Sequence, residues 1–276
     1  MNNLLFIEYM EISSSVIWLG FIIALTASVS TFLGAMTSLY FRSVNQKTLS
    51  VILGFAGGIM LYIAFMKLMP DAISVLSERL SYQETKIWSS VAFFLGITLL
   101  YPLGYLANFW KRSERAEYTE SIRHERHIAI LILTTISAHS FVEGVATFLS
   151  ILATPWVAVP LVMSIIMHNF PEGMTIGALF NRISDTMGRK RAIIYSLISA
   201  LVEPLGAMTA YIFIMNYSTP VLNGLLRAFL AGLLVATALN ELIPNSQVKG
   251  SRSISMASII AGMFIMASVL IAGTFV

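Results

Sequence analysis

Two short segments of the chain combine a histidine and a glutamate at the same spacing, 29 positions apart. They read His139-Ser-Phe-Val-Glu143 and His168-Asn-Phe-Pro-Glu172. A residue and the fourth residue after it lie on one face of an α-helix, so each segment presents an imidazole beside a carboxylate. These two groups together suit Zn²⁺, Fe²⁺, Co²⁺ and Mn²⁺. Four such ligands from two helices could complete a tetrahedral metal site.

The apolar surroundings of these segments strengthen the metal interpretation. An ionised carboxylate in hydrocarbon costs several kcal/mol unless it is paired or binds something. A lone His or Glu in a membrane can be a structural hydrogen-bonding residue, but the duplication is hard to explain as packing. Glu203 lies at a similar depth in a third apolar stretch and is followed by Pro204, and together with Asn169 it could extend the site to a second metal. Pro171 removes the backbone hydrogen bond to the carbonyl of Met167, which frees that oxygen for a cation or water.

The composition predicts an all-α polytopic membrane protein with a single transmembrane domain spanning residues 1–276. The chain has 276 residues, of which 57% are hydrophobic and 11% charged, whereas soluble domains carry about 25% charged residues. Mean hydropathy is +0.80. Cysteine is absent, which excludes disulfides and thiolate metal sites. We expect the lipid bilayer as the surroundings, no cofactor and no nucleic-acid partner.

Eight apolar segments are long enough to cross a bilayer, for which about 20 residues are needed. The expected spans are 15–40, 49–70, 87–109, 128–150, 156–181, 191–215, 221–244 and 254–275. The longest connection, 110–127, is charged and lacks apolar periodicity, which predicts a variable loop.

The distribution of Lys and Arg predicts that both termini lie outside and that the 110–127 loop is cytoplasmic. In that orientation the inner side receives Arg42, Lys47, Lys111, Arg112, Arg115, Arg123, Arg126, Arg182, Arg189, Lys190, Arg191, Lys249 and Arg252. The outer side receives only Lys67, Arg79, Lys86 and Arg227. The net charge of +3 therefore follows from topology rather than from nucleic-acid binding.

The second and seventh segments end in related ways. One ends in Lys67-Leu-Met-Pro-Asp71 and the other in Glu241-Leu-Ile-Pro-Asn245. The two segments run in opposite directions in the expected topology. This pattern indicates an inverted repeat in a 3+2+3 arrangement, an architecture that is common among transporters.

At these residues the chain resembles the ZIP (Zrt/Irt-like) family of divalent-metal transporters, most closely the bacterial ZupT-type branch. The resemblance covers nearly the whole chain. The motifs that carry it are HNFPEG at 168–173, VEPLGA at 202–207 and the glycine-containing LGFAGGIM at 53–60. It implies eight spans, both termini outside, a variable loop after the third span, and movement of divalent metal into the cytoplasm.

The resemblance also implies how the ligands are divided. The first metal site would take His139, Glu143, His168 and Glu172, and the second would take Asn169, Glu172 and Glu203, with Glu172 bridging. Three residues depart from the family pattern: Ser140 replaces Asn, Val142 replaces Pro, and Lys67 replaces a carboxylate. A cation at position 67 should repel entering metal unless it pairs with Asp71 one turn away.

The expected function is secondary transport of zinc into the cytoplasm across a cell (plasma) membrane, with iron, manganese and cobalt as further candidate substrates. The sequence contains no nucleotide-binding motif, so ATP hydrolysis by this chain is not expected. An enzyme is not expected either. A homodimer is compatible with the sequence. Two alternatives are a membrane metal sensor without flux and an intramembrane metallohydrolase. The second is disfavoured because HExxH is absent: Ser140 and Asn169 follow the two histidines.

Overall fold

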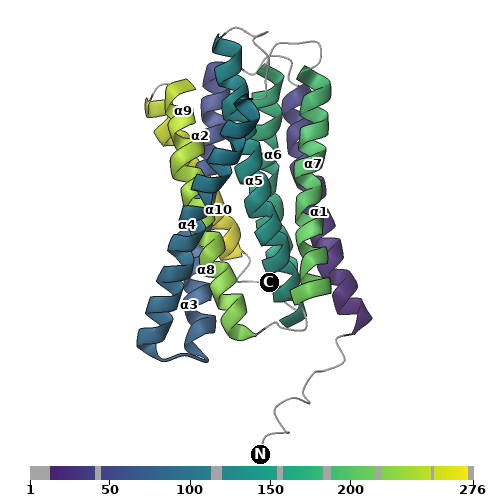
Figure 1. Ribbon diagram of the computed structural model, residues 1–276, viewed down its shortest axis with the longest axis vertical. Coiled ribbons are helices and arrows are strands. Elements are labelled where there is room, and N and C mark those ends of the chain that lie inside the picture. Colours follow the sequence, from purple (N-terminus) through teal and green to yellow (C-terminus); the bar gives the residue numbers. More distant parts are fainter. Residues whose placement is uncertain are drawn as a thin grey trace, which may run out of the picture.

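The computed structural model describes residues 13–40, 45–112, 120–153, 158–182, 188–214, 219–249 and 252–272. In these ranges every regular element is a helix (Figure 1). The helices are α1 Ser14–Tyr40, α2 Gln46–Ile63, α3 Met69–Ser77, α4 Tyr82–Arg112, α5 Glu120–Ala153, α6 Ala158–Arg182, α7 Gly188–Thr209, α8 Pro220–Thr237, α9 Ile243–Lys249 and α10 Arg252–Ala272. Short π-helical turns link α2 to α3 (Ala64–Leu68) and α8 to α9 (Ala238–Leu242), and a third extends α7 (Ala210–Ile214).

The helices confirm an all-α polytopic membrane protein. Among the described residues, six helical stretches are long and apolar enough to cross a membrane: Ser14–Tyr40, Gln46–Ser77, Ala129–Leu149, Ala192–Ile212, Pro220–Gln247 and Arg252–Ala272. Each of them contains, or largely coincides with, a span expected from the sequence.

The connection between α4 and α5 is shorter than expected. The sequence predicts a loop over 110–127, but α4 continues to Arg112 and α5 begins at Glu120. Residues 113–119 lie outside the described part of the chain. Lys, Arg and Glu are good helix formers, so charged residues without apolar periodicity can extend a membrane helix into water.

The helices form two groups that stand side by side in Figure 1. One group, which we call the site group, contains α1, α5, α6 and α7. The other, the flanking group, contains the continuous α2–α3 and α8–α9 stretches together with α4 and α10. The most extensive packing is between α1 and α6 and between α5 and α7 in the site group, and between α2 and α10 and between α4 and α8 in the flanking group.

Glycines explain why these four helix pairs pack so closely. In each pair, a glycine of either helix faces a backbone carbonyl of the other, at a separation that leaves no room for a Cβ atom. The contacts are Gly34 on Phe170 and Gly173 on Thr31 (α1–α6), Gly206 on Phe141 and Gly144 on Glu203 (α5–α7), Gly58 on Ile259 and Gly262 on Phe55 (α2–α10), and Gly96 on Phe229 and Gly232 on Phe93 (α4–α8). Small residues let helix backbones approach where lipid supplies no hydrophobic driving force.

The π-helical turns before α3 and α9 share one cause. A proline within a helix lacks an N–H group, and its ring clashes with the carbonyl four residues earlier. The residue before Pro70 is Met69, whose N–H donates to the carbonyl of Ala64, and Ile243 likewise donates to Ala238. Each bond spans five residues instead of four, which widens the turn and continues the helix through the proline. The prolines are visible in the sequence, but the π-helical turns before them were not predicted.

A substitution at one of the crossings should destabilise the protein. Gly262→Val would press a side chain against the carbonyl of Phe55, and we expect it to lower the free energy of unfolding by about 1–3 kcal/mol. Ala261→Val is the matched control because Ala261 is exposed on the same helix, and it should change stability by less than about 0.5 kcal/mol. Thermal unfolding in detergent, followed by circular dichroism, measures both. Equal stability of the two variants would contradict the role of the crossing.

Candidate metal-binding site

The helix crossings of the site group place the polar residues next to one another. Gly144 lies against the carbonyl of Glu203, and Gly173 lies against the carbonyl of Thr31. Glu143 and Glu172 directly precede these two glycines. The closest backbone contacts between α5 and α7 and between α6 and α1 therefore occur at the level of the carboxylates.

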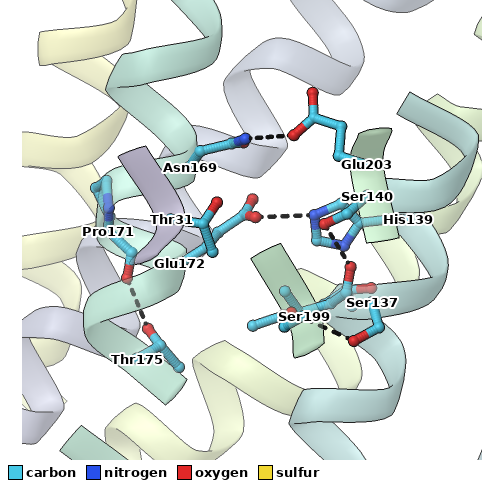
Figure 2. A network of polar contacts seen from close by, with 12 residues as sticks. Thr31, Ser137, His139, Ser140, Asn169, Pro171, Glu172, Thr175, Ser199 and Glu203 are labelled. Atoms are coloured by element: carbon cyan, nitrogen blue, oxygen red, sulfur yellow. Dashed lines mark hydrogen bonds and ion pairs between the residues drawn. The ribbon is translucent and has the colours of Figure 1, made fainter. Parts of the chain in front are cut away.

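The first pair in the site joins α5 to α6. His139 Nε2 lies 3.0 Å from Glu172 Oε2, and both side chains are essentially inaccessible. Figure 2 shows the imidazole and the carboxylate facing each other. Removing one member of this buried hydrogen bond would cost about 1–3 kcal/mol, and more if the remaining group is charged. The sequence placed these residues on different helices, and the structure brings them into contact.

The second pair joins α6 to α7. The Asn169 amide donates to Glu203 Oε2 at 2.8 Å, and both residues are buried (Figure 2). Asn169 lies three residues before Glu172 and therefore on the same side of α6. The two pairs are neighbours on one helix, as a site with a shared Glu172 requires.

Three buried oxygen atoms of these pairs have no hydrogen-bond partner among the described residues. They are Asn169 Oδ1, Glu172 Oε1 and Glu203 Oε1. A buried acceptor without a partner costs about 1–3 kcal/mol, and more if it is charged. Such acceptors are suitable metal ligands, because carboxylate and amide oxygens together with an imidazole form a ligand set for divalent transition metals.

The structure does not place every expected ligand. Glu143 is buried on α5, one turn beyond His139. His168 belongs to α6, but its side chain lies outside the described residues. Among the side chains that are described, no three His, Cys, Asp or Glu residues gather closely enough to hold a metal ion by themselves.

Lys67 forms the ion pair that the sequence left open as a possibility. Its Nζ atom lies 2.8 Å from Asp71 Oδ2, one helical turn away. Arg227 of α8, which the sequence did not connect with this carboxylate, lies 3.2 Å from the same oxygen. Two cations thus share one carboxylate oxygen. At the corresponding place in the α8–α9 stretch, Glu241 is buried and Asn245 donates to its backbone carbonyl.

No role was predicted for α1 from the sequence, yet α1 packs against α6 and α7 in the site group. Hydroxyl groups of α1 donate to backbone carbonyls of the neighbouring helices: Ser28 to Ala200 of α7, and Ser30 and Ser38 to Ile166 and Met174 of α6. Small polar residues in an otherwise apolar helix were the available signal, because such residues bind helices together in membranes.

Comparison with known proteins identifies similar chains. The family model described as "ZIP Zinc transporter" matches residues 14–127 and 111–270. A zinc transporter ZupT of Corynebacterium aurimucosum is 32% identical over 252 residues, covering 90% of this chain and 94% of the relative. Those of Chlorobaculum parvum and Akkermansia muciniphila are each 30% identical, covering 92% and 95% of this chain and 97% and 100% of the relatives.

A divalent cation should stabilise the folded protein if it satisfies the three oxygens. At 100 times its Kd, a ligand that binds only the folded state adds about 2.7 kcal/mol. We expect Zn²⁺ to raise the unfolding temperature of the wild type in detergent and to have much less effect on Glu172→Gln. Glu84→Gln is the control, because Glu84 is exposed and bonds to Ser81 at the start of α4. An undiminished Zn²⁺ effect in Glu172→Gln would place the cation elsewhere.

Proposed function

The chain belongs to the ZIP family of transporters, and from this premise we propose that it carries zinc across a cell membrane into the cytoplasm. The observation that supports this most directly is the set of three buried oxygens of Asn169, Glu172 and Glu203, for which the described part of the chain supplies no hydrogen-bond partner. Enzymatic chemistry is not part of the proposal, since the matching family and relatives are transporters.

The proposed site holds two metal positions. His139, Glu143, His168 and Glu172 form the first, and Asn169, Glu172 and Glu203 form the second. The imidazole of His139 and the amide of Asn169 each hydrogen-bond to one oxygen of a site carboxylate, Glu172 and Glu203 respectively. A metal ion would replace these hydrogen bonds, so binding is an exchange of partners rather than the filling of a rigid cage. This keeps affinity moderate, which release requires.

We propose that α4 and α6 also cross the bilayer, which gives eight spans. With 31 and 25 residues, they would extend about 46 Å and 37 Å at 1.5 Å per residue, more than the roughly 30 Å hydrocarbon core. Each is packed against a candidate span, α4 against α8 and α6 against α1.

The 3+2+3 inverted repeat is supported by matching contacts. The α2–α3 stretch corresponds to α8–α9 at a shift of 174 positions, because the π-helical turns that begin at Ala64 and Ala238 lie at that offset. The glycine contacts agree: Gly58 and Gly232 differ by the same shift. The crossing of α2 with α10 then corresponds to that of α8 with α4, and the crossing of α1 with α6 corresponds to that of α7 with α5.

Transport in this proposal is movement of the site group against the flanking group, which would expose the site to either side in turn. The glycine contacts support such a division. Each described glycine that closely approaches another helix does so within its own group. The contacts between the groups, such as α2 with α6 and α5 with α8, are less extensive than the four tight pairs.

Uptake should depend on the midplane ligands. We expect wild-type protein in proteoliposomes to take up Zn²⁺, and His168→Ala/Glu172→Ala to lose about tenfold or more of that uptake, because metal ligands are removed. Adding Fe²⁺, Mn²⁺ or Co²⁺ as competitor ranks the substrates.

The matched control for uptake is Glu78→Ala, an exposed carboxylate at the end of α3, which should retain wild-type flux. Wild-type flux in the double variant would reject the proposed site. Binding of Zn²⁺ without flux in the wild type would favour a sensor instead.

The proposed orientation predicts which side of the membrane each connection reaches. The natural chain has no cysteine, so single introduced thiols can be labelled selectively. Gln83→Cys, in the exposed start of α4, should react with a membrane-impermeant maleimide in intact cells. Lys47→Cys, in the exposed start of α2, should react only after the cells are opened. The reverse labelling pattern would place both termini inside.

A further inference from the structure

The α1–α6 and α5–α7 crossings repeat each other residue by residue. Gly34 on Phe170 corresponds to Gly206 on Phe141, and Gly173 on Thr31 corresponds to Gly144 on Glu203. Both correspondences use the same shifts, 172 positions from α1 to α7 and 29 positions from α5 to α6. The register therefore holds at two contacts in each crossing, and these contacts lie nearly one helical turn apart along the helix.

This register gives each site residue a counterpart. His139 corresponds to His168, and Glu143 corresponds to Glu172. Ser140 stands where α6 has Asn169. The counterpart of Glu203 is a residue of α1, Thr31, to which no site function has so far been given.

The position of Thr31 agrees with a place in the site. Thr31 is buried, and its carbonyl lies against Gly173, the residue after Glu172. Figure 2 shows the Thr31 side chain on the same side of α6 as the Glu172 carboxylate. Glu203 directs its carboxylate to Asn169, and the same register assigns Thr31 the equivalent position on α1.

The hydroxyl of Thr31 is weakly engaged within its own helix. It donates to the carbonyl of Ala27 at 3.3 Å. The other threonines in the described part of the chain that bond to the carbonyl four residues earlier do so at 2.7 to 3.1 Å. Unlike Ser28, Ser30 and Ser38, Thr31 makes no hydrogen bond to another helix among those that the structure describes. Its oxygen is therefore available to a cation.

We propose that Thr31 is a further residue of the metal site, contributing a neutral hydroxyl oxygen opposite Glu203. With Ser140 it forms a hydroxyl half-site that corresponds to the charged half-site of Asn169 and Glu203. The cation is then held by charge on the α7 side and by neutral oxygen on the α1 side. This proposal rests on the proposed transport site and assigns a new member to it.

The absence of cysteine allows a direct test with single thiols. We would purify Thr31→Cys, Glu203→Cys as the positive control, and Thr37→Cys as the matched control. Thr37 lies on the same helix, and its hydroxyl bonds locally to Leu33 at 2.8 Å. Each protein is titrated with Cd²⁺, and the thiolate-to-metal charge-transfer absorption is recorded. We expect the band in Thr31→Cys and Glu203→Cys, and not in Thr37→Cys or the wild type.

The outcomes distinguish a failure of the role of Thr31 from a failure of the proposed site as a whole. A band in Glu203→Cys without one in Thr31→Cys overturns the role of Thr31 and leaves the proposed site standing. No band in either variant, with no Cd²⁺ bound by the wild type, rejects the proposed site. A band of equal strength in Thr37→Cys shows unspecific capture and also overturns the role of Thr31.

A variant that keeps the shape of Thr31 provides a second measurement. Thr31→Val removes the hydroxyl without changing side-chain volume much, so it is expected to fold even if Thr31→Cys does not. Zn²⁺ affinity by equilibrium dialysis should fall about two- to tenfold, the effect of losing one neutral polar contact. Thr37→Val should bind like the wild type. Equal affinity of Thr31→Val and the wild type would overturn the proposal.

Discussion

Direct contact between helix backbones is the constraint on which the structure depends. In lipid, apolar side chains gain nothing by leaving their surroundings for one another, so helices must be held by close packing and by polar contacts. The glycines at the four tight crossings meet that need. Two of them, Gly144 and Gly173, each follow a glutamate. The crossings thus bring the carboxylates of two helices together while the helices keep each other in place.

The site balances the cost of buried charge against the need to release an ion. Glu172 and Glu203 are almost completely buried, and each has one oxygen hydrogen-bonded to a neighbouring helix, Glu172 to the imidazole of His139 and Glu203 to the amide of Asn169. Such partners stabilise a carboxylate less than a metal cation would, and the second oxygen of each has no hydrogen-bond partner in the part of the chain that the structure describes. Partners of intermediate strength therefore hold the carboxylates and can be exchanged for a cation. A carrier needs this intermediate condition, because both its loaded and its empty forms must be populated.

The positions of the helices and the Lys67–Asp71 pair could be predicted from sequence because both depend on local spacing. The hydrogen-bond partners of Glu172 and Glu203 could not be predicted, since they depend on how α5, α6 and α7 are rotated about their axes. A helix that is apolar on all sides carries no sequence signal for that rotation. In this structure the glycine contacts fix it. The prolines at 70 and 244 gave no indication that the chain would widen its turn rather than bend. The contribution of His168 remains a prediction.

The related α2–α3 and α8–α9 stretches carry side chains of opposite charge at corresponding positions. Lys67, which shares the Asp71 carboxylate with Arg227, occupies the outer counterpart of Glu241 in the proposed orientation. In the proposed transport direction, a cation approaching from outside would meet a cluster with net positive charge, and one leaving inward would pass a carboxylate. The positive cluster would slow capture of cations from dilute solution, and the carboxylate would retain a departing ion near its exit. If transport follows the proposed direction, these two positions, which lie far from the ligands, would favour uptake from metal-rich surroundings over scavenging of traces.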